Sequence, residues 1–219
     1  MNERRTKAAL RSLLILPLTA VVVCLGGCTS LLFTAAYIFK GNDAPAECDK
    51  LREKRVVVVC RPLVGLKYNL ARVDQDLAQE VGILLRQHVP KIKVVDHRKV
   101  AEWIDENTWD EYVEVGKALK ADLVVGIDLE HFDLHKSQTL FQGRANTEVK
   151  VYDCQTGKLV FRKRPAQAVY PPNREIQTSD IQEADFRRQF VRILADQLGR
   201  HFYDHDRYDN FAMDAKSIE

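Results

Sequence analysis

The chain has 219 residues, of which 46% are hydrophobic and 29% are charged, so it is long enough for one globular domain with flanking segments. Its formal net charge is +2, and removing the four basic residues and one acidic residue before Cys28 leaves 29 basic and 30 acidic residues, a charge of −1. A body this close to neutral gives no electrostatic reason to expect binding to nucleic acid, which depends on an excess of lysine and arginine.

The first 27 residues have the layout of a secretory signal. Basic residues precede an apolar run that ends at Leu25, and this order is typical of a signal peptide. The sequence LGGC, which ends at Cys28, resembles the bacterial lipobox, and that resemblance implies acyl chains such as palmitate on Cys28 and cleavage after Gly27. We therefore expect a lipoprotein signal peptide over residues 1–27 and a membrane anchor on Cys28.

An uncleaved membrane anchor is the alternative interpretation of the same region. No charged residue occurs from Ser12 to Phe39, a stretch of 28 residues, and about 20 apolar residues suffice to cross a bilayer. In both interpretations the basic N-terminus stays in the cytoplasm, so the rest of the chain faces the periplasm. Residues 28–39 are expected to form a lipidated apolar anchor segment. The threonine that follows Cys28 favours the outer membrane over the inner one, by analogy with other bacterial lipoproteins.

The remainder of the chain is expected to form a linker, one α/β domain and a flexible tail. Residues 40–54 are mostly polar and contain a glycine and a proline, which is typical of a linker. The domain is expected over residues 55–203 and the tail over residues 204–219. Three cysteines remain in this part of the chain: Cys48, Cys60 and Cys154. They allow at most one intramolecular disulfide, and their spacing does not indicate which two would pair.

Five strands are predicted from runs of β-branched residues and from alternating apolar residues. They are expected at residues 55–62, 92–96 and 121–135 and, as two strands around a tight turn, within residues 145–161. Asp153 can bond the backbone of that turn, and Gly157 tolerates a positive φ. Ahead of the turn, apolar residues alternate with a face that contains Glu148 and Lys150, so this second face is expected in water.

Four helices are predicted from apolar residues at helical spacing. They are expected from Leu70 to a point before Pro90, over residues 100–105, from Thr108 onward, and over residues 183–203. Thr108 and Glu111 have the spacing of a capping box, which places the start of the third helix at Thr108. The order β-α-β-α-α-β-β-β-α predicts a single mixed β-sheet of about five strands with helices mainly on one face.

Several stretches carry a family resemblance: RVVVV, LLRQHV, IKVVDHRKV, VGKALKADLVVGIDL and VKVYDCQTGKLVF. Together they resemble the periplasmic α/β domain of the curli-secretion lipoprotein CsgG, the TolB amino-terminal domain and the penicillin-binding-protein activator LpoB. The chain as a whole also resembles an uncharacterised bacterial lipoprotein family through its YIFKG and HFYDHD stretches. These resemblances imply a noncatalytic role in assembly, secretion or maintenance of the cell envelope, through contacts with an unidentified envelope protein. They bring no catalytic residues, so no enzyme is expected.

Two clusters carry residues that can bind metals, and the rival interpretation, a metal-dependent hydrolase, rests on the first. His131, Asp133 and His135 alternate on one strand face, and two imidazoles with a carboxylate can form a facial set of ligands. His201 and His205 stand four residues apart near the end of the last predicted helix. A strand face in water and a helix C-terminus, which favours histidine, explain the two clusters without a metal. No metal and no cofactor is therefore expected.

Two groups of residues are candidates for protein contacts. Large aromatic side chains are enriched at interaction hot spots, and three occur near the two short helices: Trp103, Trp109 and Tyr112. Packing of those helices against the sheet is the alternative role for these aromatics. A basic stripe on the last helix consists of Arg187, Arg188 and Arg192. It could meet anionic lipid or an acidic partner, or it could face water.

Overall fold

The structure is a computed structural model that describes residues 43–63 and 72–206. The predicted signal peptide, Cys28, the apolar segment to residue 39 and the tail beyond residue 206 lie outside the described residues. Contacts divide the chain into two units, and the larger one, which includes Ala44–His205, contains the α/β domain. Within the described ranges, none of the helices has the length and apolar character needed to cross a bilayer.

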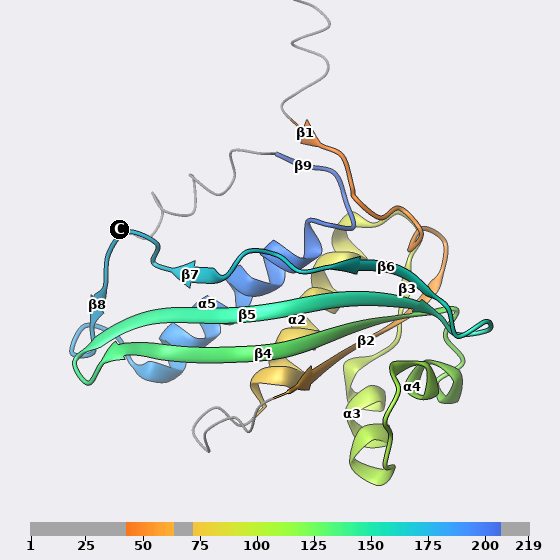
Figure 1. Cartoon of the computed structure of the whole chain (residues 1–219), viewed down its shortest axis with the longest axis horizontal. Coiled ribbons are helices and arrows are strands. Elements are labelled where there is room, and N and C mark those ends of the chain that lie inside the picture. Colours follow the sequence, from red (N-terminus) through yellow and green to blue (C-terminus); the bar gives the residue numbers. More distant parts are fainter. Residues whose placement is uncertain (1–42, 64–71, 207–219) are drawn as a thin grey trace, which may run out of the picture. The chain divides into compact units, whose positions relative to one another are not determined.

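The domain is built on a mixed β-sheet whose strands lie in the order β3-β2-β4-β5-β6 (Figure 1). These strands are β2 (Arg55–Pro62), β3 (Lys93–Val94), β4 (Leu123–Ser137), β5 (Leu140–Asp153) and β6 (Leu159–Lys163). β2 is parallel to both β3 and β4, whereas β4, β5 and β6 pair antiparallel. The short strands β7 (Ala168–Tyr170) and β8 (Ile176–Gln177) also pair with β5, and β1 (Asp43–Ala44) pairs with β9 (His205–Asp206).

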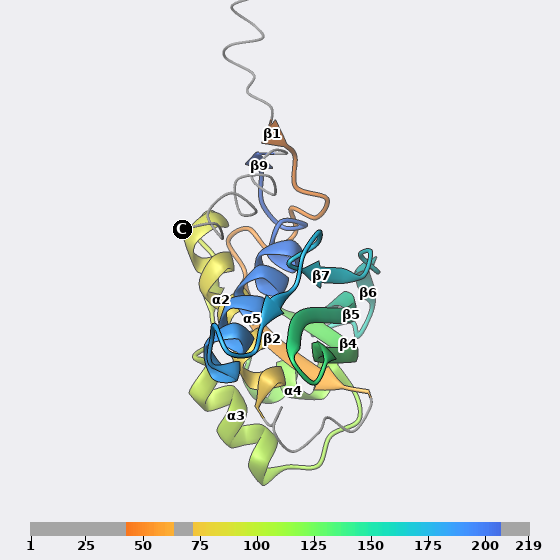
Figure 2. The ribbon, with the colours of Figure 1, turned by 90° about the vertical axis from the view of Figure 1, so that its left-hand side faces the viewer.

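Helices lie on both faces of the sheet. The two long helices, α2 (Val73–His88) and α5 (Glu183–Gly199), lie side by side on one face (Figure 2). The two short helices, α3 (His97–Glu106) and α4 (Tyr112–Ala118), cover part of the other face. Val56 and Val58 pack under the long helices, whereas Val57 and Val59 pack under the short ones. Successive side chains of β2 are buried on opposite faces of the sheet, and this explains why the strand carries four valines in a row instead of alternating apolar and polar residues.

The predicted fold class is confirmed, because the domain is α/β with one mixed sheet and the two long helices on the same face. The predicted turn is also confirmed. Oδ1 of Asp153 accepts hydrogen bonds from the backbone N–H groups of Gln155 and Thr156, at 2.9 and 2.8 Å. Gly157 has a φ of 70°, a conformation that costs glycine little.

The predicted start of one helix is wrong. α4 begins at Tyr112, with Glu111 extended at the N-cap position and without a side-chain cap. Thr108 therefore does not cap this helix. The residues between α3 and α4 instead bring the ring of Trp109 and the backbone carbonyl of Asp110 to the side chain of Arg61. Contacts with the sheet outweigh the local capping preference.

The expected linker over residues 40–54 packs against the domain over its second part, which we call the N-terminal arm (residues 44–54). Leu51 is completely buried and Cys48 is 5% exposed. The Cys48 N–H donates to the carbonyl of His201 at 2.9 Å, and the Glu47 carboxylate lies 3.0 Å from Nδ1 of the same histidine. The domain therefore begins before the first predicted strand, because the arm carries apolar side chains that the core encloses.

The three cysteines of the described residues are free and buried: Cys48, Cys60 and Cys154. Burial raises the pKa of each thiol, that of Cys154 to about 11. Cys154 lies so close under α4 that a Cβ at Gly116 would collide with its sulfur. Buried thiols with raised pKa values act as small packing residues and are unreactive.

Candidate functional site

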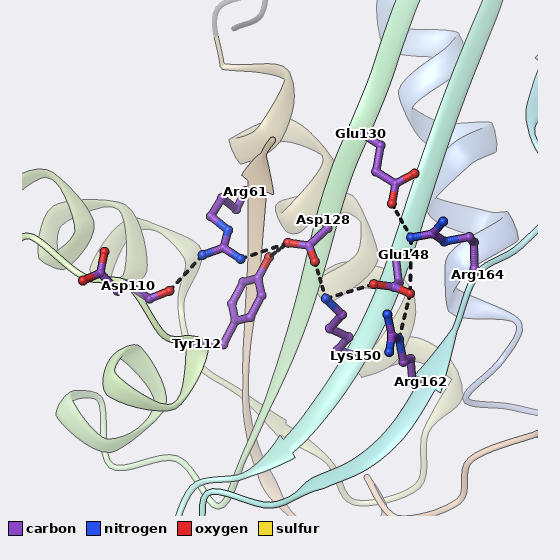
Figure 3. Close-up of polar contacts among 9 residues, drawn as sticks. All are labelled: Arg61, Asp110, Tyr112, Asp128, Glu130, Glu148, Lys150, Arg162 and Arg164. Carbon is purple, nitrogen blue, oxygen red and sulfur yellow. Dashed lines mark hydrogen bonds and ion pairs between the residues drawn. The ribbon is translucent and has the colours of Figure 1, made fainter. Parts of the chain in front are cut away.

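Charged side chains cross the sheet on the face that carries α3 and α4 (Figure 3). We call them the cross-sheet ion network: Arg61 of β2, Asp128 and Glu130 of β4, Glu148 and Lys150 of β5, Arg162 of β6, and Arg164. The strand register brings them together, because Arg61 lies opposite Asp128, Asp128 opposite Glu148, and Lys150 opposite Arg162. Two of these directly opposite pairs carry like charges, and the attraction acts between diagonal neighbours instead: Lys150 pairs with Asp128, and Arg162 pairs with Glu148.

Asp128 is the most enclosed acid of the network, at 2% exposure. It accepts hydrogen bonds from the hydroxyl of Tyr112 at 2.7 Å and from Nζ of Lys150 at 2.6 Å, and Nη2 of Arg61 lies 3.3 Å away. Burial alone would raise the pKa of Asp128, but the hydrogen bonds from Lys150 and Tyr112 outweigh it and hold that pKa below its usual range. Asp128 is therefore a charged carboxylate at neutral pH.

Glu148 is held in the same way on the next strand, at 4% exposure. Its carboxylate accepts from Nε of Arg162 at 2.8 Å and lies 2.9 Å from Nζ of Lys150. The hydrogen bond from Arg162 lowers the pKa of Glu148 to about 2, against the opposing effect of burial. Lys150 bridges Asp128 and Glu148, and these two carboxylates outweigh burial and raise its pKa.

Arg61 connects the network to the aromatic residues between α3 and α4. Its Nη1 donates to the carbonyl of Asp110 at 2.8 Å. Its guanidinium lies 4.9 Å from the ring centroid of Tyr112 and 5.7 Å from that of Trp109, within the range of cation–π attraction. Trp103 packs against the same core. Tyr112, at 2% exposure, is itself part of the core, which is the alternative role that the sequence leaves open for these aromatics.

Every acid of the network is paired with a cation of the network. Each acid has a cation within 2.8 Å: Asp128 has Lys150, Glu130 has Arg164, and Glu148 has Arg162. A general base needs a pKa near the working pH and access to a substrate proton, and here the pKa values of Asp128 and Glu148 are held low. The arrangement fixes the strands relative to one another, which is a structural role.

Sequence reasoning missed this network. Glu148 and Lys150 were expected on a face in water, but neighbouring strands enclose them and their polar atoms meet partners inside the domain. The available signal is charged residues two apart, at 128 and 130 and at 148 and 150 in two predicted strands and at 162 and 164 directly after a third. Side chains two apart share a strand face, so these pairs lie in line once the strands are adjacent.

The first metal-binding candidate does not form a ligand set. His131 is exposed, whereas His135 contacts the ring of Phe141 and lies 3.6 Å from the carboxylate of Glu183. Asp133 accepts the backbone N–H of His135 at 3.1 Å, and irregularities in the β4–β5 register on both sides of Asp133 disturb the expected alternation. Across residues 43–63 and 72–206, no three His, Cys, Asp or Glu side chains are placed to hold a metal ion.

The two histidines of the second metal-binding candidate lie beyond the end of α5 and have different surroundings. The helix ends at Gly199, before the predicted end at residue 203, because the side chains of Phe202 and Tyr203 turn into the core. His201 is thereby directed toward the N-terminal arm, and burial lowers its pKa. Nδ1 of His205 lies 3.3 Å from the carbonyl of Tyr203.

The predicted basic stripe lies on α5, beside α2. Arg188 and Arg192 are exposed, Arg187 is half-buried, and Arg188 pairs with Asp185 one turn earlier. The stripe lines a shallow groove of about 250 Å³, and α2 contributes two acids, Asp76 and Glu80, to the same groove. The acids of α2 therefore partly offset the positive charge of the stripe.

A pocket of about 430 Å³ lies between α2 and α3, beside the second half of β2. Its apolar lining includes Val58, Val100 and Ile104, and its charged lining includes Asp74 and Arg72. None of the sequence predictions points to this pocket, because it depends on how far β3 extends along β2.

No protein-family model matches the chain, and no curated protein matches it. Solved structures of similar fold include the PelC dodecamer from Paraburkholderia phytofirmans, which is 12% identical over 68% of this chain and 87% of that chain, with a TM-score of 0.39. Lipoprotein GNA1162 from Neisseria meningitidis is 10% identical over 66% of this chain and 96% of that chain, with a TM-score of 0.41. The LpoB C-terminal domain from Salmonella enterica is 11% identical over 53% of this chain and 83% of that chain, with a TM-score of 0.34. At these identities and TM-scores the likeness carries no conclusion about the role of this chain.

Proposed function

We propose that this chain is a membrane-anchored lipoprotein of the cell envelope that acts noncatalytically, through contacts with other proteins. The observation that carries this proposal is the cross-sheet ion network, in which the buried acids are committed to cations of the same domain. The sequence supports the anchor, which is lipid on Cys28, and it favours the outer membrane over the inner one. The role belongs to assembly, secretion or maintenance of the envelope.

The N-terminal arm shortens the tether that this proposal requires. A linker over residues 40–54 would reach roughly 50 Å when extended, but the arm from residue 44 onward packs against the domain. If residues 28–39 lie at the membrane, only residues 40–43 separate the anchor from the domain. Four extended residues reach roughly 13 Å. The domain is therefore held close to the membrane surface, and its partner must be found there.

A crosslinking pull-down from membranes tests the proposal with the full chain. We expect the wild-type chain to capture specific neighbouring proteins and Cys28→Ala to lose them, because the unlipidated chain would stay uncleaved and its apolar run would hold it in the inner membrane, away from partners at the outer membrane. Cys24→Ala is the matched control, since it changes a cysteine of the apolar run outside the LGGC sequence. The same neighbours recovered from Cys28→Ala would contradict the anchor, and the absence of neighbours from the wild type would contradict action through protein contacts.

A further inference from the structure

β2 has a strand on both sides over its first residues only. β3 pairs with it at Arg55 and Val56, whereas β4 pairs with it along its whole length, to Pro62. Among the described residues, the last backbone hydrogen bond on the β3 side runs from the Val95 N–H to the Val56 carbonyl, at 2.9 Å. The edge from Val58 onward therefore has no described strand beside it, as the position of β2 in Figure 1 also shows.

The sheet loses its edge strand because the chain turns away at Asp96. The sequence IKVVD predicts a strand over residues 92–96, but β3 ends at Val94. The Asp96 carboxylate accepts the backbone N–H of Arg98 at 2.9 Å and caps α3, which begins at His97. An aspartate at this position favours helix initiation over continuation of the strand. The capping of α3 thus leaves β2 partly uncovered.

The backbone groups of the uncovered edge point in a regular pattern. The carbonyl of Arg55 bonds on the β4 side, to the Asp122 N–H at 2.8 Å, whereas the carbonyl of Val56 bonds on the β3 side. The constant register between β2 and β4 keeps this alternation to the end of the strand. Val58 and Cys60 therefore direct both their N–H and their C=O groups to the side without a strand.

The pocket of about 430 Å³ lies where the missing strand would run. α2 and α3 lie on opposite faces of the sheet, and both line the pocket, α2 through Ala78 and α3 through Ala101. The pocket is therefore a slot in the plane of the sheet, enclosed by a helix on each side. Pro62 also lines it, and it has no N–H to offer on that side, as is usual for proline in an edge strand.

Two carboxylates at the slot have no ion-pair partner among the described residues. Asp74 and Asp76 lie in the first turn of α2 and line the slot, and Asp76 also borders the groove of the basic stripe. Neither forms an ion pair with a described residue. Burial and the nearby acids Asp76 and Asp105 raise the pKa of Asp74. A positive charge brought into the slot would stabilise the ionised carboxylate of Asp74 and so oppose the effects of burial and of the nearby acids.

Most cations at the slot are already engaged. Nη2 of Arg61 pairs with Asp128 at 3.3 Å, and Nη2 of Arg98 pairs with Asp96 at 3.3 Å. His97 also lies near Asp96, at 3.6 Å. Arg72, which is exposed, lines the slot together with Asp74 and Asp76, so the acids without an ion pair among the described residues outnumber such cations there.

We infer that an extended segment of a partner protein adds to β2 as a strand in this slot and places a lysine or arginine against Asp74 and Asp76. Strand addition gains its affinity from main-chain hydrogen bonds, here to Val58 and Cys60, and its specificity from side chains. The inference rests on the proposed function, because it names the surface through which the domain meets its partner.

Photo-crosslinking of the full chain in its native membrane tests the inference. The photoreactive residue p-benzoylphenylalanine replaces Gln75, which lines the slot, or Gln87, which is exposed on the same helix outside it. We expect Gln75→p-benzoylphenylalanine to form an adduct whose captured peptide belongs to another protein and contains a lysine or arginine. The double substitution Asp74→Asn and Asp76→Asn should lower the yield about tenfold. Glu102→Gln, an exposed carboxylate of α3 outside the slot, should leave it unchanged.

Four outcomes of the photo-crosslinking itself would overturn the inference: an adduct with this chain's own sequence, a captured peptide without a basic residue, equal yields from Gln75 and Gln87, or no adduct from Gln75. Ala101→Trp fills the slot from α3 and should abolish the adduct, whereas Ala118→Trp, exposed on α4, should not. Neighbours that persist in the pull-down with Ala101→Trp would refute the slot and leave the proposed function standing. Loss of neighbours only with Cys28→Ala would likewise refute the slot alone.

Discussion

Asp128→Ala is expected to lower the free energy of unfolding by about 3 kcal/mol, as removal of one partner from a buried ion pair does. The substitution takes away the acceptor of the Tyr112 hydroxyl and one of the two carboxylates around Lys150, whose side chain is 17% exposed. Glu148 still contacts Lys150 at 2.9 Å, which places the loss at the lower end for buried pairs. Urea unfolding of the full chain in detergent, monitored by tryptophan fluorescence, measures this loss in the free energy of unfolding.

Glu130→Ala is the matched control for this substitution. Glu130 belongs to the same strand and the same network, but its partner Arg164 is 61% exposed. Exposed ion pairs contribute little, so the expected loss is about 0.5 kcal/mol. Equal losses for Asp128→Ala and Glu130→Ala would contradict the conclusion that the network is a buried structural element of the sheet.

Leu51→Ala is expected to lower the free energy of unfolding by about 2–4 kcal/mol, the usual cost of truncating a fully buried leucine. Leu51 has no exposed surface, and it packs in the same core as α2 and α5. Leu159→Ala makes the same chemical change at a side chain that is 45% exposed, so its expected effect is about 0.5 kcal/mol or less. The same urea titration measures both variants.

The leucine pair separates two descriptions of the N-terminal arm. If residues 40–54 were a linker throughout, Leu51→Ala would change stability no more than Leu159→Ala. A loss at Leu51 several times larger than at Leu159 would place the arm within the cooperative unit. It would also support the short tether, because a packed arm cannot lengthen the connection to the membrane.

Local patterns in the sequence were sufficient for most of the architecture. The valine run predicts a strand buried on both faces, and the apolar spacing before Pro90 predicts the helix that covers one of them. The aspartate and glycine around residue 155 predict the β5–β6 turn. These signals succeed because each depends on residues close together in the chain.

The errors in the predicted fold come from contacts between distant residues. Thr108 has a good local capping pattern, but Arg61, far away in the chain, holds the carbonyl of Asp110 and draws that segment onto the sheet. The N-terminal arm looks like a linker by composition, yet it bonds to residues after α5 that lie at the other end of the domain sequence. Tertiary contacts of this kind outweigh local preference.

The ion network and the β2 slot depend on strand register and strand length, which a single sequence specifies weakly. Asp128 meets Glu148 only if β4 and β5 pair in one register, since a shift of one residue would move one of them to the other face. The slot exists because β3 ends at Val94. A strand over residues 92–96, as the sequence predicts, would have continued along β2 and covered part of this edge.

The proposed mechanism combines a short tether with a surface that accepts an added strand. Lipid on Cys28 would hold the domain near the membrane, and the slot beside β2 would select partners with a basic extended segment. Each part alone gives little specificity. Together they limit the partner to a protein that presents such a segment close to the membrane surface.

The lipid anchor is the central claim, and the intact mass of the full chain purified from membranes tests it most directly. The expected result is the mass of residues 28–219 plus acyl chains, with the added mass on the N-terminal peptide that begins at Cys28. A mass that retains residues 1–27 and carries no lipid would contradict the claim and establish an uncleaved membrane anchor in its place.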